Sequence, residues 1–295
     1  MTQKKLLLIV NSRAGRSKSR SPLFDAMSVF SEAGYLISVH KTTAPQDATE
    51  TVARVGGQYD LIVAAGGDGT LNETIAGLMQ LENPPLLGYL PQGSTNDFAA
   101  SLQLSNNPVT AAISIVRSLP RALDIGQWNE RSFVYVASFG AFAKSSYSAP
   151  QSAKNALGHF AYILEGMKDL DSLRPYHLRI TADSEQLDGE YLFGAVCNST
   201  SIGGLMKLDP ERVVLDDRKF ELLLIPNPKT PADLQNLVLA LLNQQYDSQG
   251  LVFRHVSSIH VETDEQIPWS LDGEYAPAVP EINITNHQKA LRMLL

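Results

Sequence analysis

The first 125 residues alternate short continuous apolar runs with stretches in which apolar residues recur at helical spacing. The apolar runs predict buried strands at residues 5–10, 35–40, 59–64 and 86–90. Helical spacing predicts helices at residues 22–33, 45–55 and 73–79, and Gly34 ends the first of these. Strands that alternate with helices in this way predict a doubly wound parallel sheet with helices on both faces.

After Pro120 the pattern changes to strands with few helices between them. Strands are predicted at residues 121–128, 133–138, 176–182, 190–198, 212–215, 220–225, 255–262, 281–285 and 290–294. Helices are predicted at residues 153–170 and 231–244, with Thr230 as the N-cap of the second. Such a succession predicts an antiparallel β-sandwich. The sequence therefore predicts an α/β domain at residues 1–125 and a β-sandwich domain at residues 126–295.

Composition narrows the class of protein. Hydrophobic residues make up 44% and charged residues 19% of the chain, as in ordinary globular domains. The net charge of −7 argues against nucleic acid as a partner. The single cysteine, Cys197, cannot form an intramolecular disulfide, which indicates a reducing cytoplasm. No apolar run reaches about 18 residues, so we expect no transmembrane segment.

The run Gly66-Gly67-Asp68-Gly69-Thr70 lies between a predicted strand and a predicted helix. Glycines at such a turn let backbone amides approach an anion, and the helix N-terminus adds positive potential. A carboxylate among these amides is unfavourable unless a cation lies between it and the anion, and Mg²⁺ is the usual cation. The run therefore predicts a site for a metal-bound polyphosphate; a plain glycine turn is the alternative.

Two other polar runs also follow predicted strands, Asn11 to Arg16 and Gly93 to Phe98. Three further places contain acidic residues: Asp124 at the domain junction, Val213 to Glu221, which joins two predicted strands, and Ser270 to Glu274. The first contains arginines that can neutralise phosphate, and the second contains hydroxyls that can cap a helix or donate to phosphate. Each run read alone is also compatible with a surface turn.

Taken together and in this order, the motifs resemble those of the diacylglycerol kinase catalytic-domain family. Gly66 to Thr70 followed by Asn72-Glu73 is similar to the nucleotide loop of the lipid kinases and, more distantly, of NAD kinases. The run Gly93 to Phe98 and the run Asp272-Gly273-Glu274 favour the lipid kinases. NAD kinases carry a different element in place of the run Gly93 to Phe98. They lack the run Asp272-Gly273-Glu274 in this context.

The resemblance implies an ATP-dependent lipid kinase that transfers the γ-phosphoryl group of ATP to a lipid hydroxyl, with diacylglycerol or a related glycerolipid as substrate. It implies that the first domain binds ATP and Mg²⁺ and that the second binds a lipid reached from the membrane surface. The protein would then be cytoplasmic with peripheral membrane contact. The implied ATP-binding residues are Asn11, Ser12, Arg13, Ala14, Gly15, Arg16, Thr42, Ala65, Gly66, Gly67, Asp68, Gly69, Thr70, Leu71, Ser94, Asn96, Asp97 and Asp124.

The resemblance also implies the catalytic and metal-binding groups. Glu274 would be the general base, and Asp68 would organise the catalytic Mg²⁺ with Asp97 and Asp124 near it. A structural Mg²⁺ would be held by the Asp217 carboxylate and by the backbone carbonyls of two further residues. These two residues are Val214 and Lys219. Arg218 stands where the family usually has glycine.

Two other functions stay open at the level of sequence. One is a kinase of the NAD kinase type with a soluble substrate, and the other is an inactive nucleotide-binding regulator. The sequence also leaves open whether the chain forms a homodimer and which lipid it phosphorylates, because the lipid pocket has no readable signature.

Overall fold

The computed structural model describes residues 3–11, 21–93, 96–140, 174–199, 201–202, 206–207, 213–243, 245–246 and 250–295. The chain forms two compact units, Met1–Ile125 with Gln288–Leu295, and Gly126–His287. The C-terminal residues from Gln288 onward thus belong to the first unit, whereas the sequence prediction assigned them to the second domain.

The first unit alternates strands and helices. Its elements are β1 (Lys4–Val10), α1 (Ser21–Glu32), β2 (Tyr35–Lys41), α2 (Asp47–Val55), a short 3₁₀ turn (Gly56–Gln58), β3 (Leu61–Gly66), α3 (Asp68–Leu78), β4 (Leu86–Pro91), α4 (Asp97–Ser101) and α5 (Pro108–Arg117). Helices α4 and α5 were not predicted from the sequence. A signal for α5 was present, because Asn107 precedes Pro108 and its side chain caps the helix by accepting from two backbone amides.

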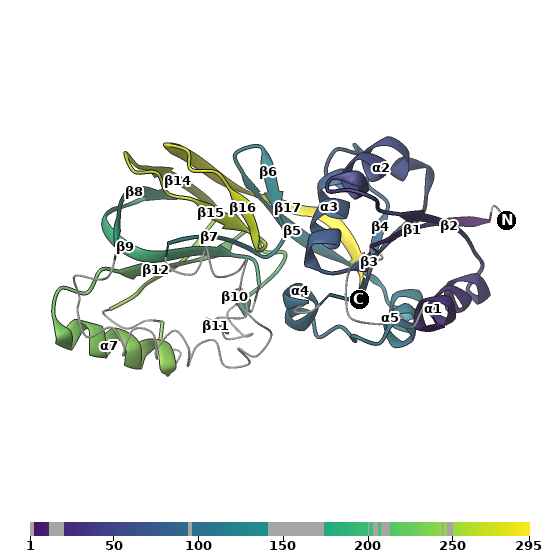
Figure 1. Ribbon diagram of the computed structural model, residues 1–295, viewed down its shortest axis with the longest axis horizontal. Helices are drawn as coiled ribbons and strands as arrows, with labels where there is room; N and C mark the ends of the chain where they lie inside the picture. The colour runs from purple at the N-terminus through teal and green to yellow at the C-terminus, as the bar shows by residue number, and fades with distance from the viewer. Residues whose placement is uncertain are drawn as a thin grey trace. The chain divides into compact units, whose positions relative to one another are not determined.

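The strands β2, β1, β3 and β4 lie in this order and pair in parallel. Helices α2 and α3 cover one face of the sheet, and α1 and α5 cover the other (Figure 1). All six residues of β3 are buried because both faces of the sheet are covered. The predicted doubly wound parallel sheet is confirmed.

The second unit consists mainly of antiparallel strands. Its elements are β6 (Arg131–Phe133), β7 (Val136–Gly140), β8 (Tyr176–Ala182), β9 (Glu185–Cys197), β10 (Ser201–Ile202), β11 (Met206–Lys207), β12 (Phe220–Pro226), α7 (Pro231–Leu242), β13 (Val252–Val256), β14 (Ser258–Glu262), β15 (Trp269–Leu271) and β16 (Glu274–Ala276). Two further strands, β5 (Pro120–Trp128) and β17 (Glu281–Leu294), run through both units. The predicted N-cap of α7 is confirmed, since the Thr230 hydroxyl accepts from the backbone amide of Asp233.

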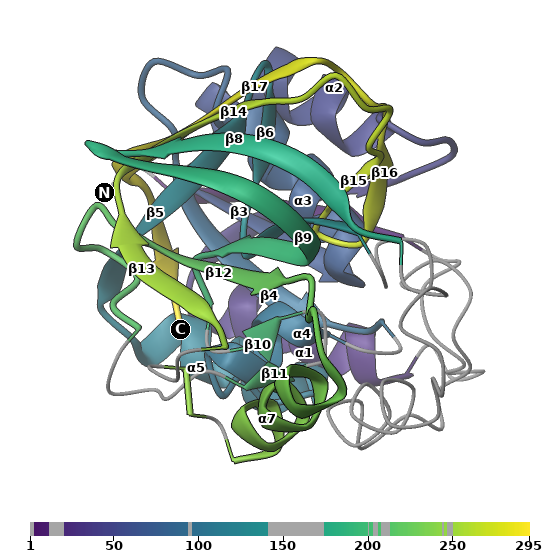
Figure 2. The ribbon, with the colours of Figure 1, turned by 90° about the vertical axis from the view of Figure 1, so that its left-hand side faces the viewer.

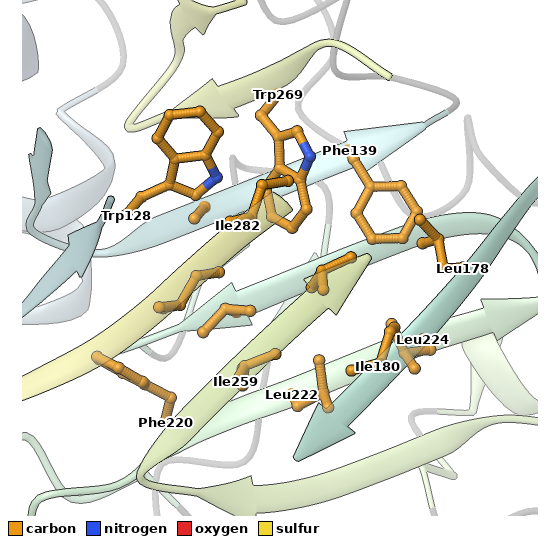
Figure 3. Packing of buried hydrophobic residues seen from close by; sticks show 14 of the residues in the cluster. Trp128, Phe139, Leu178, Ile180, Phe220, Leu222, Leu224, Ile259, Trp269 and Ile282 are labelled. Carbon is orange, nitrogen blue, oxygen red and sulfur yellow. The ribbon is translucent and has the colours of Figure 1, made fainter. Parts of the chain in front are cut away.

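Strand β9 joins the two layers of this sandwich. Its first half pairs with β8, and its second half pairs with β12 (Figure 2) and, on the other side, with β7. Side chains of β8, β14 and β17 pack against side chains of β7, β12 and β15 (Figure 3). Phe139 and Trp269 belong to this core, and their ring centroids lie 5.0 Å apart. The predicted antiparallel β-sandwich is confirmed.

Two predicted strands are interrupted by carboxylates that bind backbone amides. The strand expected at residues 133–138 is broken because the amides of Val134 and Tyr135 donate to Asp272 instead of continuing a ladder. The strand expected at residues 255–262 is broken between β13 and β14, where the amides of Ser257 and Ser258 donate to Asp183.

Other predictions of elements need correction. Residues 213–215 lie in an irregular turn, so the strand predicted at residues 212–215 is wrong for these residues. The strands predicted at residues 281–285 and 290–294 are one strand, β17. The helix predicted at residues 153–170 lies outside the described residues. None of the helices in the described part of the chain is long and apolar enough to cross a membrane.

Candidate active site

The candidate nucleotide site lies where β1, β3 and β4 end. The amide of Asn11 donates to the carbonyl of Ala65 at 3.0 Å, and the amide of Gln92 donates to the carbonyl of Gly66 at 2.7 Å. Thr42 follows β2, and its amide donates to the carbonyl of Val10 at 2.9 Å. Ligands of open α/β sheets bind beyond the carboxyl ends of the strands, so these turns form the expected binding edge.

Close backbone packing explains the glycines of these turns. A Cβ atom on Gly93 would come within 2.6 Å of the Cα atom of Gly67. A Cβ atom on Gly66 would come within 2.4 Å of the hydroxyl oxygen of Thr70, to which the Asn11 side-chain amide donates at 3.2 Å. The turns after β3 and β4 are therefore in contact, and only glycine fits where they meet.

Two carboxylates lie at this contact. Asp68 is the first residue of α3, and its Oδ2 accepts the backbone amide of Asp97 at 3.1 Å. Its other oxygen, Oδ1, is buried and has no hydrogen-bond partner among the described residues. Burial raises the pKa of Asp68, opposed by backbone amides of residues 96–98. Burial, together with the charge of Asp68, raises the pKa of Asp97 to about 6.

Asn96 stabilises the turn that follows β4. It has a positive φ of 51°, and its Oδ1 accepts the Gly93 amide at 2.8 Å. The hydroxyl of Tyr89 also donates to Asn96 Oδ1 at 3.4 Å, and burial beside Asp68 and Asp97 raises the pKa of this tyrosine. The sequence analysis did not identify Tyr89 as part of this site. The only sequence signal was its hydroxyl group within the apolar run at residues 86–90.

Of the predicted ATP-binding residues that the structure describes, most gather here. They are Asn11, Thr42, Ala65, Gly66, Gly67, Asp68, Gly69, Thr70, Leu71, Asn96 and Asp97. The side chains of Ala65 and Leu71 belong to the core, so only their backbone could contact a ligand. The predictions for Ser12, Arg13, Ala14, Gly15, Arg16 and Ser94 lie outside the described residues.

Asp124 lies on β5 within the first unit and is buried. Its Oδ1 accepts the backbone amide of Lys289 on β17 at 2.7 Å. Lys289 has a positive φ of 52°, which an L-residue adopts only when its surroundings hold it there. The carboxylate of Asp124 thus ties the returning C-terminal strand to β5.

In the second unit, Asp272 and Gly273 form the two-residue turn of the β15–β16 hairpin. Both have positive φ values, 51° and 85°, as a type I′ turn requires. The Asp272 side chain is buried, whereas Glu274 is partly exposed, with its Oε2 3.9 Å from Nη2 of Arg131. The two acids of this motif therefore differ in role, because one binds backbone and the other is accessible.

The turn predicted to hold a structural metal has an exposed Asp217, whose Oδ1 accepts the amide of Lys219 at 2.9 Å. Arg218 has a φ of 69°, so arginine adopts here the left-handed conformation that glycine favours. Val214 is also exposed at this turn. Nearby, burial raises the pKa of Glu221 to about 8, with a further contribution from the charge of Asp217.

A divalent cation fits the site at Asp68 and Asp97 better than the turn at Asp217. The Oδ1 atom of Asp68, which is buried and unpartnered within the described part of the chain, is an oxygen ligand of the kind that Mg²⁺ prefers. Within the described residues, no group of three or more His, Cys, Asp or Glu side chains could hold a metal ion by itself. Magnesium is often bound through one or two carboxylates together with phosphate oxygens, which Asp68 and Asp97 could provide with a nucleotide.

Comparison with known proteins defines the class. The diacylglycerol kinase catalytic domain matches residues 5–128, and the YegS C-terminal NAD kinase beta sandwich-like domain matches residues 136–295. These two domains together are those of an ATP-dependent lipid kinase, which confirms the activity predicted from the sequence. The second description also accounts for the distant likeness to NAD kinases.

The relatives define the family. Diacylglycerol kinase of Bacillus subtilis (strain 168) is 34% identical over 288 residues, which cover 96% of this chain and 95% of that protein. Diacylglycerol kinase of Staphylococcus aureus (strain MRSA252) is 30% identical and covers 97% of this chain and 91% of its own length. The chain therefore belongs to the diacylglycerol kinase family.

Solved structures support the fold. The crystal structure of a diacylglycerol kinase from Bacillus anthracis str. Sterne matches with a TM-score of 0.79 at 24% identity. The match covers 99% of this chain and 96% of that one, so the order of the α/β and sandwich parts is shared along the whole chain.

Proposed function

We propose that the protein transfers the γ-phosphoryl group of ATP to the free hydroxyl group of diacylglycerol or of a related glycerolipid, with Mg²⁺ as cofactor. The names of the relatives from B. subtilis and S. aureus support this acceptor. The observation that carries the proposal is the Asp68 Oδ1 atom at the N-terminus of α3, which is buried and has no hydrogen-bond partner among the residues that the structure describes.

The phosphates of ATP would lie against the turn between β3 and α3. Backbone amides at the start of α3 can donate to phosphate oxygens, and the helix dipole favours their negative charge. Asn11 follows β1 and Thr42 follows β2, and both would contact the nucleotide. Residues 12–16 and Ser94, which the sequence analysis predicted, would contact it as well. Asp68 and Asp97, with Asp124, would orient a bound Mg²⁺, which would neutralise charge on the transferred phosphoryl group.

Glu274 would accept the proton of the lipid hydroxyl as general base. It is a partly exposed carboxylate in the unit proposed to bind the lipid, so it can reach a substrate. Asp272 fixes the hairpin that carries it, through three backbone amides.

A second Mg²⁺ with a structural role would bind at Asp217 and the carbonyls of Val214 and Lys219. The conformation of Arg218 supports this, because the turn keeps the backbone that glycine allows in the family. The expected sign is a rise in melting temperature with Mg²⁺ that Asp217→Ala abolishes.

The lipid would be reached from the membrane surface, with the protein in the cytoplasm. Turnover should therefore depend on lipid dispersed in micelles or vesicles. A homodimer stays a prediction, which sedimentation of the purified protein tests directly.

The decisive experiment measures ATP consumption with a panel of acceptors. Diacylglycerol, phosphatidylglycerol, undecaprenol and a sphingoid base are offered in detergent micelles, and NAD is offered without lipid. We expect the highest kcat/KM with diacylglycerol. Phosphorylation of NAD in the lipid-free assay would contradict the proposal. The proposal would also be contradicted if none of the lipid acceptors supported consumption of ATP.

Two variants in the same assay test the roles of the acids. Asp68→Asn keeps a hydrogen-bond acceptor but removes the charge, and it should lower kcat by about 10²–10³-fold. Glu274→Gln should lower kcat by about 10²–10⁴-fold and leave ATP affinity nearly unchanged. Normal turnover in a folded variant would remove that residue from the catalytic groups.

A further inference from the structure

We infer that Glu73 is a positioning residue that sets the affinity for ATP by fixing the loop after β2 to helix α3. Glu73 lies in α3, five residues after Asp68, and is half-buried. Its Oε1 accepts the backbone amide of Gln46 at 2.9 Å, and its Oε2 lies 3.3 Å from the backbone amide of Ala48, which donates to it. Its own carbonyl accepts the hydroxyl of Thr49 at 2.9 Å.

These contacts cap α2 from a different helix. The first amides of a helix have no acceptor within it, and the Gln46 side chain does not supply one. The Glu73 carboxylate satisfies two of these amides and places a negative charge at the positive end of the helix. Gln46 has a positive φ of 69°, a conformation that costs a non-glycine residue energy and that Glu73 helps to hold.

The loop fixed in this way carries a proposed nucleotide contact. Thr42 begins the loop, and its amide is bonded to the carbonyl of Val10. Asn11, the residue after Val10, donates from its side-chain amide to the hydroxyl of Thr70, which lies on α3. Helix α3, the loop and the end of β1 thus form a closed series of hydrogen bonds, and Glu73 supplies the contact between the loop and the helix.

The inference rests on the proposed function, because the loop matters to catalysis only if ATP lies at these turns. Opening the series at Glu73 releases the loop but leaves Asp68, Asp97 and Glu274 in place. The expected effect is therefore on ATP binding and not on the chemical step.

The test compares Glu73→Ala and Glu73→Gln with the parent protein. Glu73→Ala should raise KM for ATP about tenfold, because it removes both bonds of the carboxylate to the backbone amides of Gln46 and Ala48. The value of kcat and KM for lipid should change less than about threefold. Glu73→Gln keeps one acceptor oxygen and should restore part of the ATP affinity.

Asp233→Ala is the matched control. Asp233 caps α7 in the second unit by accepting the amide of Thr230 at 2.9 Å, so its loss should lower the melting temperature without changing KM for ATP. If Glu73→Ala lowers the melting temperature in the same way and leaves KM for ATP unchanged, Glu73 is only structural and the inference is overturned.

Affinity for a non-hydrolysable ATP analogue, measured by calorimetry, separates this inference from the proposed function. If the parent protein binds the analogue but phosphorylates no lipid, the proposed substrate is wrong. A loss of analogue affinity in Glu73→Ala would still support the inference in that case. Equal analogue affinity in the parent and in Glu73→Ala would overturn the inference whatever the acceptor.

Discussion

Several acidic side chains of this protein bind backbone amides. Asp272, Asp183 and Glu73 each accept two or more backbone amides from a distant segment. Asp47 makes similar bonds nearer in sequence, to the amide and hydroxyl of Thr43. Such bonds fix irregular segments that regular ladders cannot satisfy, so a carboxylate at a turn is not by itself a sign of catalysis.

The titration of Asp47 should be visible in the stability of the protein. The Thr43 amide, His40 and the Thr43 hydroxyl together lower the pKa of Asp47 from 3.8 to about 2. The ionised carboxylate therefore stabilises the fold above about pH 4, and this contribution is lost as the pH falls toward 2. Asp47→Asn should lower the free energy of unfolding at pH 7, and the difference from the parent protein should shrink between pH 4 and pH 2.

Urea unfolding at pH 7, 4 and 3 measures this difference. A constant difference over that range would mean that the asparagine acts through lost packing or geometry and not through the charge of Asp47.

At the scale of elements, the β15–β16 hairpin shows how a short motif serves two purposes. Its two-residue turn places the Asp272 carboxylate on the amides of Val134, Tyr135 and Val136, at 2.6–3.0 Å. The same hairpin presents Glu274 at the start of β16. Rigid backbone support of this kind would position Glu274 for its proposed role as general base.

Asp272→Asn tests the hairpin. Asparagine tolerates a positive φ, so the substitution removes charge without straining the turn. The side-chain NH₂ group of asparagine cannot accept a hydrogen bond from a backbone amide, as the carboxylate oxygen it replaces does. We therefore expect a loss of about 1.5–3 kcal/mol in the free energy of unfolding. The exposed turn residue Asp183, which also has a positive φ, supplies the control: Asp183→Asn should cost about 1 kcal/mol or less. Equal losses in chemical denaturation would contradict the special role of the buried carboxylate.

At the scale of the molecule, two strands connect the units. Strand β5 begins in the first unit and ends in the second, and β17 does the reverse. Leu291, Met293 and Leu294 of β17 are buried, and Leu294 joins the core of the first unit. The first unit is therefore built from two separate stretches of chain, residues 1–125 and 288–295, whereas the second is one continuous stretch.

Because β5 and β17 each run through both units, we expect the two units to unfold together. The two tryptophans of the chain, Trp128 and Trp269, lie in the second unit, so their fluorescence reports on its core. Far-UV circular dichroism also follows α1 to α5 of the first unit. The two signals should give the same denaturant midpoint, and two separate midpoints would show that the shared strands do not couple the units.

The sequence alone determined the features that depend on near neighbours. Apolar periodicity predicted the alternating strands and helices of the first unit, and the glycine-rich run around Asp68 predicted an anion site between a strand and a helix. Helical and strand spacing act over a few residues, so these patterns can be read without the fold. The family resemblance carried the activity for the same reason, because its motifs are short and contiguous.

Only the tertiary structure decided where the long-range polar contacts go. Asp272 binds Val134 across 138 residues, Asp124 binds Lys289 across 165, and Glu73 binds Gln46 across 27. Nothing local marks such partners, so the breaks between β6 and β7, the return of β17 to the first unit and the cap on α2 were not predicted. Which carboxylates bind backbone and which can face a substrate follows from burial, and burial depends on packing between segments far apart in the chain.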